Sequence, residues 1–195
     1  MIKKTKRIFV VVADQRRNDK NPTFWQKEEL LLPEMQKILD NVYLRYLAET
    51  SFVLAGSSHF TRAIQAGQCV SGNSYVSKFD DLDPVSEGAW DLLLAENPGV
   101  KNFTDRAMFE RRESRYLLLA EGKNLLRLIK SMADRIKMGQ NVLLVSNRLF
   151  VESAMAQAEG KIDLRYLENG DTVLFQFEEN KKFVGLEILP SRLSR

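Results

Sequence analysis

The sequence predicts an α/β protein of three layers, in which helices cover both faces of a mostly parallel β-sheet that ends in an antiparallel hairpin. Three short apolar runs predict buried strands: Ile8–Val12, Ser51–Ala55 and Asn141–Val145. Segments with the periodicity of amphipathic helices separate these runs, as they do in βαβ units. Near the carboxyl end, strict alternation over residues 172–178 and a further strand-like run over residues 183–189 predict the hairpin.

Four helices are predicted from apolar residues that recur every three or four positions. They are expected at residues 33–47, 60–70, 113–137 and 151–158. Pro33 stands at the first position of the first helix, where a missing N–H costs nothing. Gly72, Gly139 and Gly160 follow the last periodic residues of the other three and are expected to end them. Residues 75–98 are rich in Asp, Ser, Gly and Pro, so a long excursion with one helical turn is expected there.

Composition favours a single globular domain over residues 1–195, because 44% of the residues are hydrophobic and 28% are charged. The net charge of +3 is spread along the chain, so no nucleic-acid partner is expected. The single cysteine, Cys69, excludes an intramolecular disulfide and fits a reducing compartment. The apolar run after the basic first residues is too short for a signal peptide or a membrane span. We therefore expect a cytoplasmic protein that does not contact a membrane.

Each of the three predicted strands leads into a small or polar turn that carries an arginine. Because the carboxyl ends of parallel strands meet at one edge of a sheet, these turns are expected to converge there. The residues expected to bind a phosphate or another anion at this edge are Arg16, Arg17, Ser58, Arg62, Asn147 and Arg148. The alternative is that the arginines are solvated or pair with Asp14, Asp19 and Glu152. Spacing alone does not decide between a pocket and these surface pairs.

Other reactive residues are few. His59 is the only histidine, so any imidazole chemistry depends on it, although a lone loop histidine is more often a helix cap or a surface residue. Cys69 lies late in a helix and is expected to be a small core residue rather than a reactive thiol. The run Asp80–Asp83 is expected to be a solvated acidic turn, with weak cation binding as the alternative. No metal and no cofactor are predicted.

The same turns resemble motifs of the histidine phosphatase superfamily, whose fold is called phosphoglycerate-mutase-like. The most specific match is Ser57–Ala66, which is similar to the family's Ser-Ser-Pro-Leu-x-Arg-Ala-x-Gln-Thr and puts Arg62 on the family's phosphate-binding arginine. Leu31–Glu34 resembles the Leu-Thr-Pro-Glu helix start, and Glu87–Trp90 resembles the Phe-Gly-Glu-Trp turn. Glu113-Ser114 is similar to the end of Gly-Glu-Ser. The matches cover nearly the whole chain in the family's order.

The departures from the family concern its catalytic residues. The family's nucleophilic histidine falls on Ala13 or Asp14, depending on the register of the first strand, and its second histidine falls on Asn147. The arginine beside the nucleophile falls on Val12 or Ala13. The expected acid falls on Pro84, with Asp83 or Glu87 as displaced substitutes.

The resemblance therefore implies a pseudoenzyme that keeps an arginine-lined pocket and binds a phosphorylated small molecule or an acidic partner protein. The alternative is a divergent phosphatase or phosphohydrolase that uses Asp14 or His59 in place of the family's histidines. A third possibility is a structural role in a larger assembly, through an apolar face around Phe24, Trp25 and Trp90. The oligomeric state is left open.

Overall fold

A mixed six-stranded sheet forms the centre of the molecule. The computed structural model describes residues 5–13, 30–82, 112–161, 165–180 and 182–192. Its strands are β1 (Lys6–Val12), β2 (Leu54–Ser57), β3 (Ser77–Lys78), β4 (Asn141–Ser146), β5 (Thr172–Phe177) and β6 (Phe183–Leu189). They are arranged in the order β3-β2-β4-β1-β5-β6, in which β3, β2, β4 and β1 run parallel to one another. β5 runs antiparallel to both β1 and β6, which confirms the predicted fold class.

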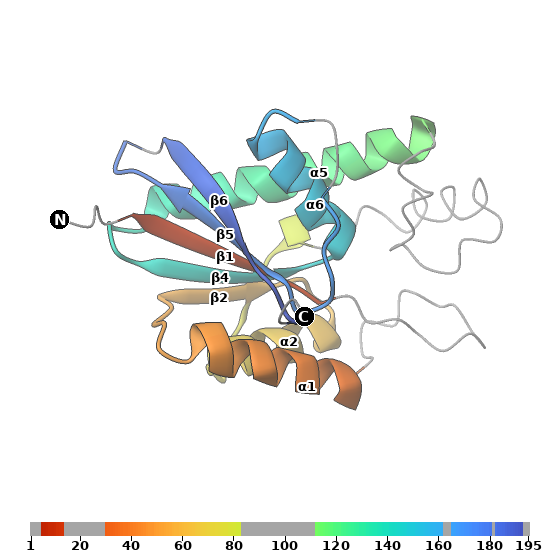
Figure 1. The fold of residues 1–195 in the computed structure, drawn as a ribbon, viewed down its shortest axis with the longest axis vertical. Helices are drawn as coiled ribbons and strands as arrows, with labels where there is room; N and C mark the ends of the chain where they lie inside the picture. The colour runs from red at the N-terminus through yellow and green to blue at the C-terminus, as the bar shows by residue number, and fades with distance from the viewer. Residues whose placement is uncertain (1–4, 14–29, 83–111, 162–164, 181, 193–195) are drawn as a thin grey trace.

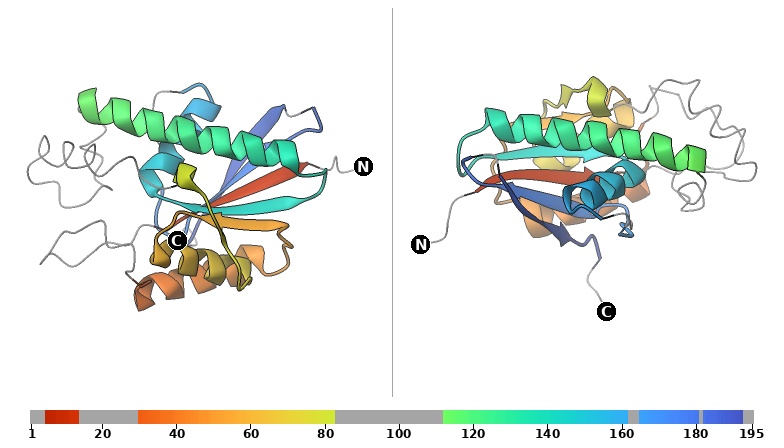
Figure 2. Two further views of the ribbon diagram at one scale, coloured as in Figure 1. Left: turned by 180° about the vertical axis from the view of Figure 1, so that it is seen from behind. Right: turned by 90° about the horizontal axis from the view of Figure 1, so that it is seen from above.

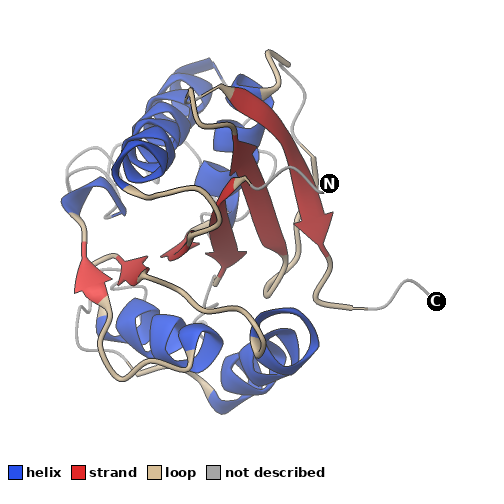
Figure 3. Ribbon diagram, turned by 90° about the vertical axis from the view of Figure 1, so that its left-hand side faces the viewer, coloured by secondary structure: helices blue, strands red, loops and turns tan. Residues whose placement is uncertain are grey.

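Helices cover the two faces of this sheet (Figures 1 and 3). Their bounds are α1 (Pro33–Val42), α2 (Thr61–Ser71), α5 (Arg112–Arg135) and α6 (Arg148–Ala158). α1 and α2 pack on one face, while α5 and α6 lie on the opposite one, so that the molecule has three layers (Figure 2). α1 continues into a π-helical turn over Tyr43–Leu47, and a 3₁₀ turn spans Asp80–Leu82.

The alternation of side chains along β1 explains why this strand is central. Ile8, Val10 and Val12 are buried in the apolar layer beneath α5 and α6. Phe9 and Val11 are buried in the layer beneath α1 and α2. A strand segment buried on both faces must be apolar at every position, which is what residues 8–12 of β1 provide.

The register of the strands brings their carboxyl ends to one edge. Val12 pairs with Ser146, and the backbone N–H of Ala13 donates to the carbonyl oxygen of Ser146 at 3.2 Å. The antiparallel β5 begins at this edge, because Val12 donates to the carbonyl oxygen of Asp171 at 2.9 Å and accepts from Gly170 at 2.8 Å. The loop before β5 therefore lies beside the turns that follow β1 and β4.

Two strands differ from the sequence-based prediction. β2 begins three residues later than expected and includes Gly56 and Ser57, which had been expected in the turn. Gly56 fits this position because the ring of Phe79 lies against it, and an added Cβ would lie 2.4 Å from that ring. β3 was not predicted, since two residues are too few to show a periodicity.

Within the described residues, no helix is both long and apolar enough to cross a membrane.

Candidate anion-binding site

The candidate site is the edge of the sheet where β1, β2 and β4 end. We call it the carboxyl rim and define it by the described residues Ala13, Ser57, Ser58, Ser146 and Asn147. Ligands of open α/β sheets bind at this kind of edge, because turn amides and helix N-termini face it.

The turn after β2 combines buried hydroxyls with a helix N-terminus. Ser57 is buried and its hydroxyl donates to the carbonyl oxygen of Ser58 at 3.0 Å, and Ser58 is buried too. α2 then begins at Thr61, and its N-cap residue Phe60 supplies no side-chain hydrogen bond to the first turn. Backbone N–H groups at a helix start carry partial positive charge, so this end of α2 favours an anion.

Arg62 adds a full positive charge to the first turn of α2. Its guanidinium carbon lies 4.7 Å from the centre of the Phe60 ring, so the arginine stacks on the residue that precedes the helix. This contact keeps the guanidinium near the helix N-terminus, where its charge adds to that of the backbone.

The end of β4 contributes a third buried serine, and the turn after it caps a helix. Ser146 is only 6% exposed, and its Oγ has no hydrogen-bond partner among the described residues. Asn147 is the N-cap of α6, and its side-chain oxygen accepts from the backbone N–H of Leu149 at 3.0 Å. The hydroxyl of Ser146 is therefore buried without a described partner, while the side-chain oxygen of Asn147 caps the start of α6.

Arg148 is directed toward the loop before β5. It is 7% exposed, and its Nη1 donates to the hydroxyl of Tyr166 at 3.3 Å and lies 3.5 Å from the carbonyl oxygen of Leu167. Its guanidinium carbon lies 5.1 Å from the centre of the Tyr166 ring. One turn further along α6, Glu152 accepts from the backbone N–H of Leu167 at 2.7 Å. No pattern in the sequence singles out Tyr166, which lies in an aperiodic segment.

His59 and the acidic turn lie next to each other on the surface. The Nε2 of His59 lies 3.6 Å from a carboxylate oxygen of Asp80, whose side chain is fully exposed. An exposed pair of this kind is weak, because water competes for both partners. Asp81 pairs with Arg127 at 3.0 Å, so its carboxylate is occupied by a cation of the protein itself.

Three of the predicted site residues, Asp14, Arg16 and Arg17, lie outside the described residues. The same is true of Asp83, Pro84 and Glu87, and of the aromatic residues Phe24, Trp25 and Trp90.

Cys69 lies in α2 and is partly buried, which fits the expectation of a small core residue. Burial raises the pKa of its thiol, and the nearby Asp40 carboxylate raises that pKa further. A thiol with a raised pKa is a poor nucleophile, because the thiolate is the reactive form.

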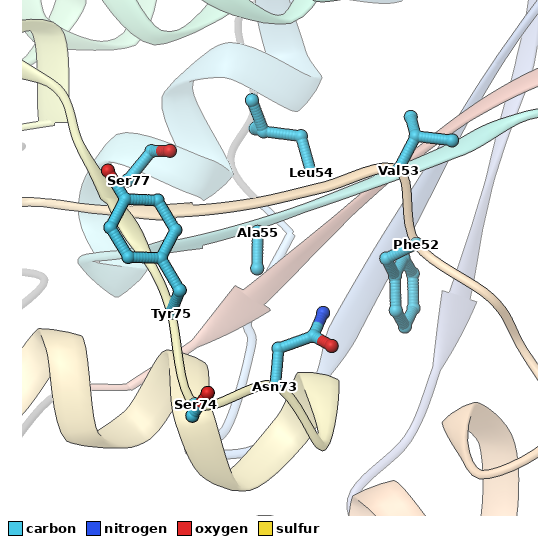
Figure 4. Close-up of a pocket in the computed structure, with 8 residues that line it drawn as sticks. All are labelled: Phe52, Val53, Leu54, Ala55, Asn73, Ser74, Tyr75 and Ser77. Atoms are coloured by element: carbon cyan, nitrogen blue, oxygen red, sulfur yellow. The ribbon is translucent and has the colours of Figure 1, made fainter.

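A separate pocket of about 360 Å³ lies along the amino-terminal half of β2 (Figure 4). Its lining residues are Phe52, Val53, Leu54, Ala55, Asn73, Ser74, Tyr75 and Ser77. None of the predicted site residues is among them. The pocket is therefore distinct from the carboxyl rim.

Comparisons with known proteins identify the fold. No family model matches the chain, and no curated protein sequence matches it. Among solved structures it is similar to the phosphoglycerate mutase from Bacillus anthracis, with a TM-score of 0.65 at 15% identity over 96% of this chain and 93% of that one. It is also similar to YhfR of Bacillus stearothermophilus, with a TM-score of 0.64 at 15% identity over 92% and 95% of the two chains.

A third similar structure is a putative α-ribazole-5′-phosphate phosphatase from Escherichia coli, with a TM-score of 0.62 at 15% identity over 95% and 96% of the two chains. At these identities the similarity shows the fold alone, which is that of the phosphoglycerate mutase and of the other two structures.

Proposed function

We propose that this protein binds a phosphorylated small molecule, or an acidic partner protein, in an anion pocket at the carboxyl rim and transfers no phosphoryl group. The residues that we assign to the binding are Ser58, Arg62, Asn147 and Arg148, together with Arg16 and Arg17 from the part of the chain outside the described residues. The protein is then a pseudoenzyme with a histidine phosphatase fold.

The donors gathered at the carboxyl rim support an anionic ligand. Arg62 carries a full charge at the uncapped start of α2, and Ser58 lies just before that start. The hydroxyl of Ser146 is buried without a described partner, and such a group costs about 1–3 kcal/mol unless it is satisfied. A bound phosphate oxygen satisfies it and removes this cost.

The observation that carries the proposal is the identity of the two residues that follow the central strands. Ala13 and Asn147 come directly after β1 and β4, whose last residues are paired in register. Neither side chain can accept a phosphoryl group at nitrogen, because an alanine methyl and an amide are not nucleophiles. The chain's single histidine, His59, follows β2 instead.

Isothermal titration with phosphate, sulfate and sugar phosphates tests the proposal. We expect binding of at least one of these anions, and a loss of about tenfold or more in Arg62→Ala, because a charge-assisted hydrogen bond contributes about 1.5–3 kcal/mol. Arg135→Ala is the matched control, since Arg135 is an exposed arginine at the last position of α5, just before β4 begins, and so lies at the opposite edge of the sheet. Absence of binding, or binding unchanged in Arg62→Ala, contradicts the proposal.

The proximity of His59 and Asp80 favours the second candidate function, a divergent phosphatase. In that case His59 acts as base or nucleophile, with Asp14 as the other candidate. A phosphatase screen with several divalent metals tests it. Activity that is lost in His59→Ala or in Asp14→Asn supports the enzyme, whereas activity that survives both changes assigns the reaction to neither residue.

A further inference from the structure

The side chain of Tyr166 is exposed but held in place at the carboxyl rim. The residue is 55% exposed, although its hydroxyl accepts from Nη1 of Arg148 and its ring lies over the guanidinium at 5.1 Å. An exposed tyrosine usually samples several rotamers. The ring of Tyr166 is instead held on one side by the buried guanidinium of Arg148.

The support beneath Tyr166 consists of two buried charged residues. Arg148 is 7% exposed and Glu152 is 1% exposed, and both lie near the start of α6, one turn apart. Burial of charged groups is costly and persists only where they make specific contacts. Here the contacts go to Tyr166 and Leu167, so the pair fixes this loop to α6.

The same loop is fixed to the sheet at its other end. Gly170 donates to the carbonyl oxygen of Val12, and Asp171 accepts from Val12, so the loop is hydrogen-bonded to the last residue of β1. One carboxylate oxygen of Asp171 accepts from the N–H of Glu168 at 2.8 Å. Tyr166 is thus held from both sides, beside the turn that contains Ser146 and Asn147.

We infer that the ligand of the carboxyl rim carries a planar aromatic ring next to its phosphate group, and that Tyr166 stacks on this ring. The inference rests on the proposed function, because the phosphate group is bound by the rim. A ring that is already immobilised loses little conformational entropy when a second ring stacks on it. Aryl phosphate monoesters are therefore the ligand class that this arrangement favours over aliphatic ones.

Titration of three probes tests the inference: inorganic phosphate, phenyl phosphate and cyclohexyl phosphate, which matches the size of phenyl phosphate without its aromatic ring. We expect the wild-type protein to bind phenyl phosphate about three- to tenfold more tightly than cyclohexyl phosphate. Tyr166→Ala should abolish this preference. The ratio of the affinities for phenyl and cyclohexyl phosphate within that variant is the quantity compared, because loss of the contact with Arg148 changes the binding of the phosphate group equally for both probes. Tyr166→Phe should keep the preference, since it retains the ring.

Tyr75→Ala is the matched control, because Tyr75 is 77% exposed and lines the pocket beside β2, outside the rim. This variant should behave like the wild type. If inorganic phosphate binds but phenyl phosphate binds no more tightly than cyclohexyl phosphate, or if Tyr166→Ala keeps the preference, the inference is wrong while the proposed function stands. If none of the three probes binds, the proposed function itself is wrong.

Discussion

Glu152 accepts a hydrogen bond from the backbone N–H of Leu167 at 2.7 Å, and this contact joins α6 to the loop that leads into β5. Both residues are buried, so water cannot replace either partner. The contact joins residues that are 15 positions apart in the sequence, and it holds the loop that contains Tyr166 and Leu167 beside the carboxyl rim.

Replacement of this carboxylate should destabilise the protein. We expect Glu152→Ala to lower the free energy of unfolding by about 1–3 kcal/mol, because it leaves a buried N–H without an acceptor. Urea denaturation measures this change. Glu159→Ala is the control, since Glu159 forms ion pairs with the exposed Lys161 and Arg165, and loss of such pairs costs about 0–1 kcal/mol. Equal effects of the two changes would contradict the assigned role of Glu152.

The contact between α5 and α6 depends on the absence of a side chain at Gly122. A Cβ at this position would lie 2.5 Å from Cβ of Ser153 and 2.8 Å from its backbone carbon. Gly122→Ala should therefore force the two helices apart and lower the free energy of unfolding by about 1–3 kcal/mol. Thermal unfolding followed by circular dichroism measures it.

Gly185 in β6 offers the matching control for Gly122, because nothing lies within 4 Å of a Cβ added there. Gly185→Ala should leave the melting temperature nearly unchanged or raise it slightly, since alanine restricts the unfolded chain more than glycine does. A Gly122→Ala variant as stable as Gly185→Ala would show that the helices can separate at little cost.

The N-cap of α6 should also contribute to stability. Asn147→Ala removes the acceptor for the N–H of Leu149 and should lower the free energy of unfolding by about 1 kcal/mol. Asn147→Ser keeps a capping oxygen and should recover most of that loss. Chemical denaturation of the two variants makes the comparison, and a serine variant no more stable than the alanine variant would argue against a capping role.

The thiol of Cys69 should react slowly. Because burial and the Asp40 carboxylate raise its pKa, the folded protein carries less thiolate at pH 8 than the unfolded chain does. Alkylation by iodoacetamide should therefore be slower in the native state than in urea. Cys69 is the only cysteine, so the extent of reaction reports on it alone.

The same shift predicts a dependence of stability on pH. A thiol with a raised pKa in the folded state keeps its proton where the unfolded thiol has lost it. The contribution of Cys69 to the free energy of unfolding is therefore fully retained below pH 9.0, the ordinary pKa of a cysteine. It is lost as the pH rises above that value. Cys69→Ala should flatten this alkaline decline, and an unchanged profile would assign the decline to other groups.

The architecture was predictable from the sequence because its signals are local. β1 and β4 are continuous apolar runs, and the alternation of Val173, Phe175 and Phe177 correctly predicted one buried face of β5. Gly72, with a φ of 66°, adopts the left-handed conformation expected where α2 ends. The periodicity of apolar residues and the residues that form turns predict these elements without any knowledge of tertiary contacts.

The side-chain partners at the rim were not predictable, because they join distant parts of the chain. The sequence shows Arg148 after a strand, which favours an anion ligand, but it does not show that Tyr166 and Leu167 lie against the guanidinium. The sequence also predicts the end of β2 too early, at Ala55, for a similar reason. Gly56 belongs to the strand, where the ring of Phe79 lies against it, and that contact leaves no local pattern.

β1 lies between β4 and β5 in the sheet, although both strands are far from it in the sequence, and this separation affects folding during synthesis. Arg7, in β1, donates to the side-chain oxygen of Asn141, in β4, at 2.7 Å across 134 positions of the sequence. β1 therefore waits for its two partner strands until β4 and β5 have been made. Contacts between such distant residues slow folding, and an unpaired apolar strand is prone to aggregate. We expect the nascent chain to need a chaperone at β1 until β4 has emerged.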